Sequence, residues 1–249
     1  MIAPAAAVRS ALLPLAVLLV WELLARAGAL SPHWFPAPTR LLQTLIDLGA
    51  SGALVRHIGA TLLRMALGFT CGVATGTALG IATGRSQQLR TLLDPSLQAL
   101  RSIPSLAWVP LFLLWLGIGE TSKVALIALG VFFPVYLNLT AGLDSIDRRL
   151  LEVAQLYSYR RLRLVRHVLL PATLPAYITG LRSGLGLGWM FVVAAELMGA
   201  SRGLGYLLVD GQTTSRPELV MSAIACFALL GKLTDLPLAT WSRRWQHRG

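Results

Sequence analysis

Charged residues are scarce in this chain, and their scarcity excludes most water-soluble folds. Only 13% of the 249 residues are charged, whereas 55% are hydrophobic. A soluble domain carries about 25% charged residues, which it needs to cover its surface. The mean hydropathy of +0.65 points the same way. The composition therefore predicts a membrane protein whose surface faces lipid.

Acidic residues are the scarcer kind of charge, with 11 Asp and Glu against 22 Lys and Arg, which gives a net charge of +11. A basic protein can bind nucleic acid, but that requires a solvated basic face. Here the arginines gather at the ends of apolar stretches, where membrane topology places them. We therefore expect membrane lipids to face this charge, and we expect no nucleic-acid partner.

The side chains on which most enzymes and metal sites depend are also sparse. Cys71 and Cys226 both lie inside apolar stretches, which indicates small buried residues and not a disulfide or metal site. The four histidines are scattered among predicted loops. The sequence has no G-x-S-x-G elbow, and its fragment GKLTD at 231–235 lacks the upstream glycine-rich loop of a Walker A motif. We expect neither an enzymatic activity nor a cofactor or metal bound by this chain.

Long apolar stretches, in contrast, are abundant. About 20 apolar residues in a helix cross the hydrocarbon core of a bilayer, and such spans must be helical because lipid cannot satisfy backbone polar groups. The stretch at 11–25 lacks a clean cleavage site for a signal peptidase, so we read it as part of a retained span. The sequence therefore predicts an all-α, polytopic membrane protein with six spans, at about 11–29, 61–83, 101–118, 123–143, 177–199 and 219–240.

The basic residues predict the orientation of these spans, because cytoplasmic loops carry an excess of Lys and Arg. With the N-terminus inside, the inner loops hold twice as many basic residues as the outer ones. This distribution favours a topology with both termini in the cytoplasm. The inner set is Arg9, Arg85, Arg90, Arg101, Arg148, Arg149, Arg160, Arg161, Arg163, Arg166, Arg182, Arg243, Arg244 and Arg248; the outer set is Arg26, Arg40, Arg56, Arg64, Lys123, Arg202 and Arg216.

Glycines recur every four residues in the second predicted span. Residues four apart lie on one face of a helix, so these glycines form a nearly straight groove. Small residues let two helix backbones approach closely in lipid. We predict a helix-packing seam made of Gly68, Gly72, Gly76, Gly80 and Gly84.

Ionisable residues inside predicted spans are functional candidates. Glu196, near the outer end of the fifth span, is either a pathway residue or a structural one. Lys232 and Asp235 are three apart on one helix face, and we read them as a structural pair near the inner end. On the outer side, Arg64 and Arg202 would either attract an anionic substrate or anchor the chain at the interface.

The densest basic segment, LEVAQLYSYRRLRLVRHVLLP at 151–171, is also half apolar. Its spacing predicts two short amphipathic helices with a break near Ser158. Two interpretations stay open: the segment rests on anionic lipid headgroups, or its apolar side chains dock into a groove on a cytoplasmic partner.

The stretch EVAQLYSYRRLRLVRHVLLPATLPAYITGLR resembles the cytoplasmic EAA loop of ABC importer permeases, here at about 150–171. Glu152 and Ala154 match the Glu and the second Ala of that loop, while Val153 replaces the first Ala and Ser158 stands where Gly is usual. The downstream matches are Leu170, Pro171, Pro175, Gly180, Leu181 and Arg182.

Further stretches narrow the resemblance to one branch of these permeases. Residues 101–138, 189–208 and GKLTD are similar to the nitrate, sulfonate and taurine permeases, and most similar to those for aliphatic sulfonates. The resemblance implies one transmembrane domain over 1–249, with core spans over about 61–240, in a type I importer of the bacterial cytoplasmic membrane. It implies a homodimer, two cytoplasmic ATPases that bind the ATP, and a periplasmic or lipid-anchored substrate-binding protein.

The same resemblance implies which residues couple the permease to its ATPases: Glu152, Ala154, Ser158, Arg160 and Leu164. It implies import of an organic anion, with an aliphatic sulfonate as the leading candidate and taurine or nitrate as alternatives. A different class, an ATP-independent secondary transporter, would carry internal repeats with broken helices at corresponding positions. No convincing repeat of this kind is visible in the sequence.

Overall fold

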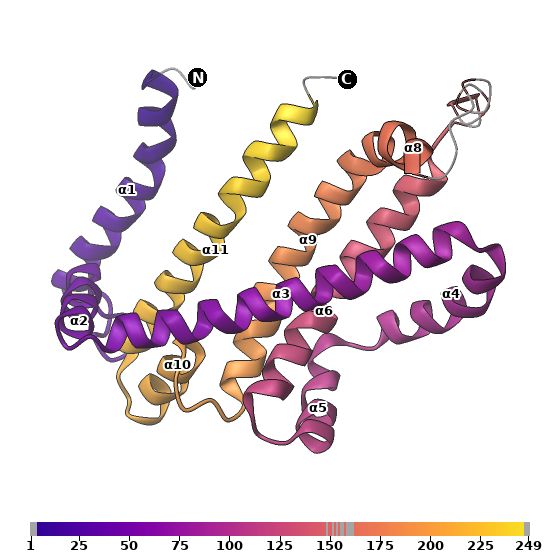
Figure 1. Ribbon diagram of the computed structural model, residues 1–249. Coiled ribbons are helices and arrows are strands. Elements are labelled where there is room, and N and C mark those ends of the chain that lie inside the picture. Colours follow the sequence, from indigo (N-terminus) through magenta and orange to yellow (C-terminus); the bar gives the residue numbers. More distant parts are fainter. Residues whose placement is uncertain are drawn as a thin grey trace. The chain divides into compact units, whose positions relative to one another are not determined.

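The protein is described by a computed structural model that covers residues 4–147, 149–150, 152, 154, 157 and 162–246. Over these residues the regular secondary structure is entirely helical, which confirms the all-α prediction (Figure 1). The helices are α1 (Pro4–Arg26), α2 (Pro38–Ala50), α3 (Ala53–Arg85), α4 (Gln87–Ser102), a 3₁₀ turn (Ser105–Ala107), α5 (Trp108–Leu116), α6 (Glu120–Asp144), α8 (Leu162–Leu164), a π-helical turn (Val165–Leu169), α9 (Leu170–Leu197), α10 (Leu204–Thr213) and α11 (Pro217–Gln246).

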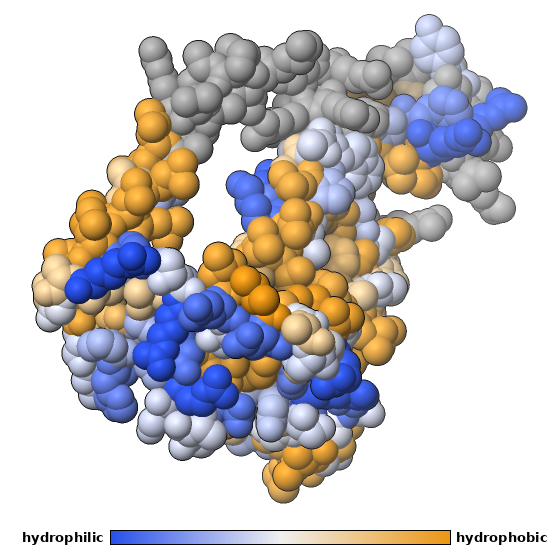
Figure 2. All heavy atoms as spheres, turned by 90° about the vertical axis from the view of Figure 1, so that its left-hand side faces the viewer, coloured by the Kyte–Doolittle hydropathy of each residue, from blue (hydrophilic) through white to orange (hydrophobic). Residues whose placement is uncertain are grey.

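Four helical segments are long and apolar enough to cross a membrane. They are Ala53–Gly84, Glu120–Asp144, Val165–Leu197 and Pro217–Ser242. They correspond to the spans predicted at 61–83, 123–143, 177–199 and 219–240. Figure 2 shows hydrophobic side chains exposed over much of the face that it draws, as expected for a surface in contact with lipid.

The first predicted span corresponds to α1, which starts earlier than expected and ends at Arg26. Its 23 residues give a length of about 35 Å, enough for a hydrocarbon core of about 30 Å. Large apolar side chains such as Leu13 (73% exposed) and Leu19 (64% exposed) cover its surface. At its end, Glu22 accepts hydrogen bonds from Arg26 and from the backbone N–H of Thr39 in the first turn of α2. A carboxylate at this position stabilises the start of α2.

The third predicted span, at 101–118, is not one helix, so that prediction was wrong. Helix α4 ends at Ser102, and Ile103 is extended, with φ −69° and ψ 126°. The physical cause is Pro104, which has no N–H to donate and which disfavours the helical conformation of the residue before it. The chain resumes in α5, whose nine residues span about 14 Å and cannot cross a membrane alone.

The chain divides into two compact units. The first comprises Met1–Ala60 with Ser201–Ala228, and the second comprises Thr61–Ala200 with Leu229–Gly249. The single transmembrane domain expected over 1–249 stays a prediction. The functional side chains described below all lie within the second unit.

Helix α6 forms the centre of the second unit, where it packs antiparallel along α9. Ile127, Val131 and Val135 on α6 are wholly buried. On one side of α6 lie the five glycines of α3. A Cβ atom added at Gly68 would come within 2.5 Å of Ile127 Cβ, and one at Gly72 within 2.5 Å of the Ala128 carbonyl oxygen. The two backbones approach so closely here that only hydrogen fits.

The other three glycines of this row face α6 in the same way. A Cβ atom at Gly76 would lie 2.9 Å from the Phe132 carbonyl oxygen, and one at Gly80 or Gly84 would lie 2.9 Å or 2.5 Å from a leucine side chain of α6. The five glycines thus line the contact of α3 with α6 over most of its length.

A second glycine row, on α9, faces the same central helix and was not recognised in the sequence. A Cβ atom at Gly180 would lie 2.8 Å from Asn138 Cβ, and one at Gly184 would lie 3.3 Å from the backbone oxygen of Val131. Gly188 continues the row. These glycines are four residues apart, but the additional glycine in LRSGLGLG obscures the pattern in the sequence.

Candidate functional site

The segment resembling an EAA loop presents both buried and exposed side chains. Ala154 is only 2% exposed, so its methyl group packs inside the chain. Leu150 is 50% and Tyr157 71% exposed, and Glu152 is exposed as well. Ala154 therefore supports the segment from within, while its neighbours form the surface that a partner can reach. Two of the expected coupling positions, Ser158 and Arg160, lie outside the described residues.

The part of this segment from Leu162 onward continues without interruption into the long helix that follows. Helix α8, the π-helical turn and α9 run from Leu162 to Leu197 without a gap, and Figure 1 shows α8 at the end of α9. Leu164 is half-buried, while Arg163, Arg166 and His167 are exposed. A π-helical turn is rare and is frequently found at functional positions. A force applied at α8 can therefore be transmitted directly along α9.

A group of charged side chains lies at the N-terminal end of α6, and most of its members are buried. Arg64 on α3 is 2% exposed and donates from Nη1 to Glu196 on α9 at 2.7 Å and from Nε to Glu120 on α6 at 2.6 Å. The Thr61 hydroxyl donates to Glu196 at 2.9 Å. Lys123 is also buried and donates to the Gly119 carbonyl oxygen at 2.9 Å. Arg64 was expected to attract an anionic substrate or to anchor the chain at the interface, but it lies inside the chain, where two carboxylates hold it.

This cluster joins α3, α6 and α9 at one end of the second unit. A buried ion pair is sensitive to the loss of either member, because the remaining charge is then unpaired in a medium of low dielectric constant. Glu196 is fully enclosed, with its carboxylate held by Thr61 and Arg64. A role for Glu196 in the pathway stays a prediction.

The predicted pair of Lys232 and Asp235 was wrong. Asp235 on α11 accepts two hydrogen bonds of 2.9 Å from the guanidinium of Arg182 on α9. The planar fork of an arginine matches the two oxygens of a carboxylate, and an ammonium cannot provide this geometry. The Trp189 indole N–H donates to the Thr234 hydroxyl at 2.9 Å and makes a second polar link between the same two helices.

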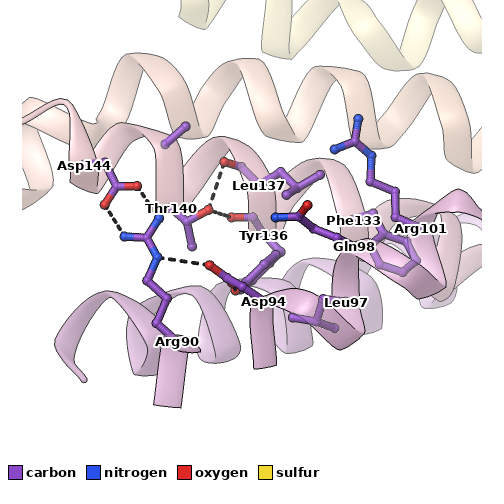
Figure 3. A pocket seen from close by; sticks show the side chains of 11 residues that line it. Arg90, Asp94, Leu97, Gln98, Arg101, Phe133, Tyr136, Leu137, Thr140 and Asp144 are labelled. Carbon is purple, nitrogen blue, oxygen red and sulfur yellow. Dashed lines mark hydrogen bonds and ion pairs between the residues drawn. The ribbon is translucent and has the colours of Figure 1, made fainter. Parts of the chain in front are cut away.

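Polar side chains also fix α4 to α6, as Figure 3 shows. Arg90 donates to both oxygens of Asp144, at 2.6 and 2.5 Å, and to Asp94 at 3.1 Å. The Tyr136 hydroxyl donates to Asp94 at 2.6 Å. The hydrogen bond from Tyr136, with that from Arg90, holds the pKa of the Asp94 carboxyl below its ordinary value. The two carboxylates raise the pKa of Arg90, which keeps it charged.

Two cavities lie beside this cluster and share Arg101, Phe133 and Leu137 in their walls. The smaller, of about 190 Å³, contains the Arg90 cluster and Gln98. The larger, of about 390 Å³, lies between α4, α5, α6 and α9. The sequence pattern had assigned Arg101 to topology alone. A signal was present, because Arg101 is the one charge in the apolar stretch 101–118 and stands three residues before Pro104.

Comparison with known proteins identifies a matching family and several similar transport proteins. Residues 72–246 match the family described as the binding-protein-dependent transport system inner membrane component. A protein of Bacillus subtilis described as an aliphatic sulfonates transport permease is 41% identical over 90% of this chain and 81% of the relative. The taurine transport system permease protein of Escherichia coli is 39% identical over 92% of this chain and 86% of the relative.

A solved structure shows the same fold. The comparison is with inward-facing conformations of the MetNI methionine ABC transporter, and it gives a TM-score of 0.67 at 19% identity, over 79% of this chain and 98% of the other. The type I importer fold expected from the sequence is thereby confirmed.

Proposed function

This chain belongs to the binding-protein-dependent transport permeases, the inner-membrane components of ABC importers, and from this premise we propose that it forms the pathway of an ATP-driven importer of organic anions, with aliphatic sulfonates as its substrates. The observation that carries the proposal is the identity of 41% to a described aliphatic-sulfonate permease over 90% of the chain. Taurine is the second candidate, because a described taurine permease is nearly as similar.

The exposed surface around Tyr157 suits the docking of a cytoplasmic ATPase. An aromatic side chain with 71% of its surface exposed outside the membrane-crossing segments is a typical anchor for a partner's groove. Arg163 and Arg166, which follow it in the chain, are exposed as well, and their positive charge favours an acidic rim on the partner.

The continuity of α8 and the π-helical turn with α9 supports a mechanism of coupling. In the proposed cycle, ATP binding closes two ATPase subunits and draws together the docking segments of two permease copies. Because α9 is packed along α6 through small residues, the two helices move as one body. The movement opens the pathway towards the outside, where a binding protein delivers the anion, and ATP hydrolysis restores the starting state.

Reconstituted transport tests this proposal. The chain is placed in liposomes with a candidate ATPase and binding protein, and uptake of labelled hexanesulfonate, taurine and nitrate is measured with and without ATP. We expect uptake of the alkanesulfonate that requires ATP and both partners. Uptake without ATP would overturn the importer mechanism in favour of a secondary transporter. ATP-dependent uptake of taurine or nitrate alone would leave the mechanism intact and replace the substrate.

The docking surface has its own test in Tyr157→Ala. Removing an aromatic anchor from the centre of an interface typically weakens binding by about 2 kcal/mol, or roughly 30-fold. We expect the variant to insert normally and to lose the ATPase on co-purification. Trp34→Ala is a matched control, since Trp34 is also 71% exposed but lies in the first unit, between α1 and α2. Equal ATPase recovery with both variants would contradict the assignment.

The interior position of Ala154 changes what a substitution there can show. A charged residue in its place would disturb the segment from within, because Ala154 is 2% exposed and a buried charge without a partner is costly. Loss of the ATPase in such a variant therefore reports on the shape of the segment, whereas Tyr157→Ala reports on direct contact.

A further inference from the structure

The larger cavity lies level with the middle of α6. Its α6 wall runs from Leu129 to Asn138, and α6 itself runs from Glu120 to Asp144. Helix α6 is one of the segments long and apolar enough to cross the membrane. The cavity is therefore placed halfway along a membrane-crossing helix.

Aromatic and aliphatic side chains dominate the wall of this cavity. Trp108 comes from α5, Phe133 from α6 and Phe191 from α9, with leucines, Ile103 and Pro134 between them. The polar side chains in the wall are those of Asn138, whose amide donates to the Pro134 carbonyl oxygen, and Arg101. The site thus combines one full positive charge with an apolar wall.

Arg101 differs from the arginines of the polar clusters described above. Arg64, Arg90 and Arg182 each form ion pairs with carboxylates. For the Arg101 guanidinium, no hydrogen bond or ion pair is found within the part of the chain that the structure describes. Figure 3 shows it at the far end of the smaller cavity from Asp144, with no dashed line reaching it. Arg101 is exposed, so a ligand can reach its guanidinium. Ionisable side chains that face a cavity beside membrane-crossing helices mark sites where ions or substrates pass.

We propose that the larger cavity is a binding site for the transported anion within the permease, in which the Arg101 guanidinium binds a sulfonate headgroup and the wall formed by Trp108, Phe133 and Phe191 contacts the alkyl chain. This inference rests on the proposed function, since it assumes an organic anion as substrate. A guanidinium offers parallel N–H donors that match the oxygens of an oxyanion. A volume of about 390 Å³ is in the range of small-molecule sites.

The wall also determines which anion the site prefers. An alkyl chain gains free energy from contact with the aromatic side chains. Taurine would place an ammonium group against the same wall without a carboxylate among the lining residues named here, which is unfavourable. Nitrate has no chain to bury. The site should therefore favour a longer alkanesulfonate over taurine, and either over nitrate.

Direct binding to the full-length permease tests this site without any partner. The chain is reconstituted in phosphatidylcholine nanodiscs and titrated calorimetrically with butanesulfonate, pentanesulfonate, hexanesulfonate, taurine and nitrate. We expect the dissociation constant to fall about fourfold with each added methylene, because burying one CH₂ is worth about 0.8 kcal/mol. Trp108→Ala should reduce this dependence on chain length and leave the binding of nitrate unchanged.

Variants of the charged group test the headgroup contact. Arg101→Gln should weaken hexanesulfonate binding at least about tenfold, as expected for the loss of a hydrogen bond to a charged group. Arg101→Lys, which keeps the charge but not the fork, should weaken it less. Arg56→Gln is the matched control, because it removes an exposed positive charge from the other unit. Gel filtration and thermal unfolding of each variant establish that it is folded.

The outcomes separate this inference from the proposed function. Failure of the wild type to bind hexanesulfonate, equal binding by wild type and Arg101→Gln, or no dependence on chain length would each overturn the site. If ATP-dependent sulfonate uptake persists in that case, the proposed function stands without the site. If binding depends on Arg101 but liposomes take up none of the anions with ATP, the site stands and the proposed function fails.

Discussion

Substituting Gly72 by Ala would test the close packing of α3 against α6. An added Cβ atom would lie 2.5 Å from the carbonyl oxygen of Ala128 and 2.7 Å from Cβ of Val131. To restore a separation of even 3.0 Å from the oxygen, the helices must move apart by at least 3.0 − 2.5 = 0.5 Å. The obstacle is backbone, so no change of rotamer relieves it.

The expected magnitude follows from a comparison with Gly186→Ala. Gly186 lies within α9, and a Cβ atom there would have no neighbour within 4 Å. Both changes replace a helical glycine by alanine, so the gain from helix propensity, about 0.5–1 kcal/mol, cancels in the comparison. What is left is the cost of overpacking at Gly72, typically about 1–3 kcal/mol. For a chain of this length, that corresponds to a difference in melting temperature of at least about 2 °C.

Thermal unfolding of the purified variants, followed by tryptophan fluorescence in one detergent, measures this difference. We expect Gly186→Ala to melt at or slightly above the wild-type temperature and Gly72→Ala to melt below it. Limited proteolysis at a fixed temperature tests the same ranking independently, and Gly72→Ala should be cleaved fastest. If Gly72→Ala proved as stable as Gly186→Ala, the helices could not be packed as closely as described here.

Two further predictions concern the polar clusters of the second unit. Glu196→Gln removes one of the two carboxylates that pair with the buried Arg64, which keeps Glu120, and should destabilise the protein by about 1–3 kcal/mol. Glu120 has a side chain that is 54% exposed, so Glu120→Gln should cost less, and equal losses in thermal unfolding would contradict this. The hydrogen bond from Tyr136 lowers the pKa of Asp94 from its ordinary 3.8, so its contribution to stability is present above about pH 4 and is lost as the pH falls through the lowered pKa. The melting temperature of the wild type should therefore drop more between pH 5 and pH 3 than that of Asp94→Asn, and parallel curves would refute the assignment.

The long helices could be predicted because their signal is local. A run of mostly apolar residues such as 123–143 predicts contact with lipid or protein, because it lacks the charged side chains of a solvated surface. Its backbone N–H and C=O groups must then form hydrogen bonds with each other, which predicts a helix. The third span failed for a related reason: hydrophobicity over 101–118 reports burial or lipid contact and says nothing of backbone continuity. The break was encoded in Pro104, whose effect on Ile103 is steric and independent of polarity.

The charge pairs could not be predicted, because partners distant in sequence leave no local trace. Arg64 and Glu196 are 132 residues apart, and nothing in either neighbourhood indicates the other. For Asp235 the nearest candidate, Lys232, was chosen, although Arg182 lies 53 residues away and offers the better geometry. The coupling positions came from a resemblance, and they stay predictions.

The break between α4 and α5 has a consequence for where lipid can reach. Non-helical backbone is not tolerated in contact with hydrocarbon, because carbonyl groups there would lose their hydrogen-bond partners. Ile103 and Pro104, which lie between α4 and the 3₁₀ turn, must therefore face protein or water, and acyl chains are excluded from their backbone. Brominated lipids should accordingly quench the fluorescence of Trp21, which lines an apolar groove on α1, far more than that of Trp108, which follows the break directly.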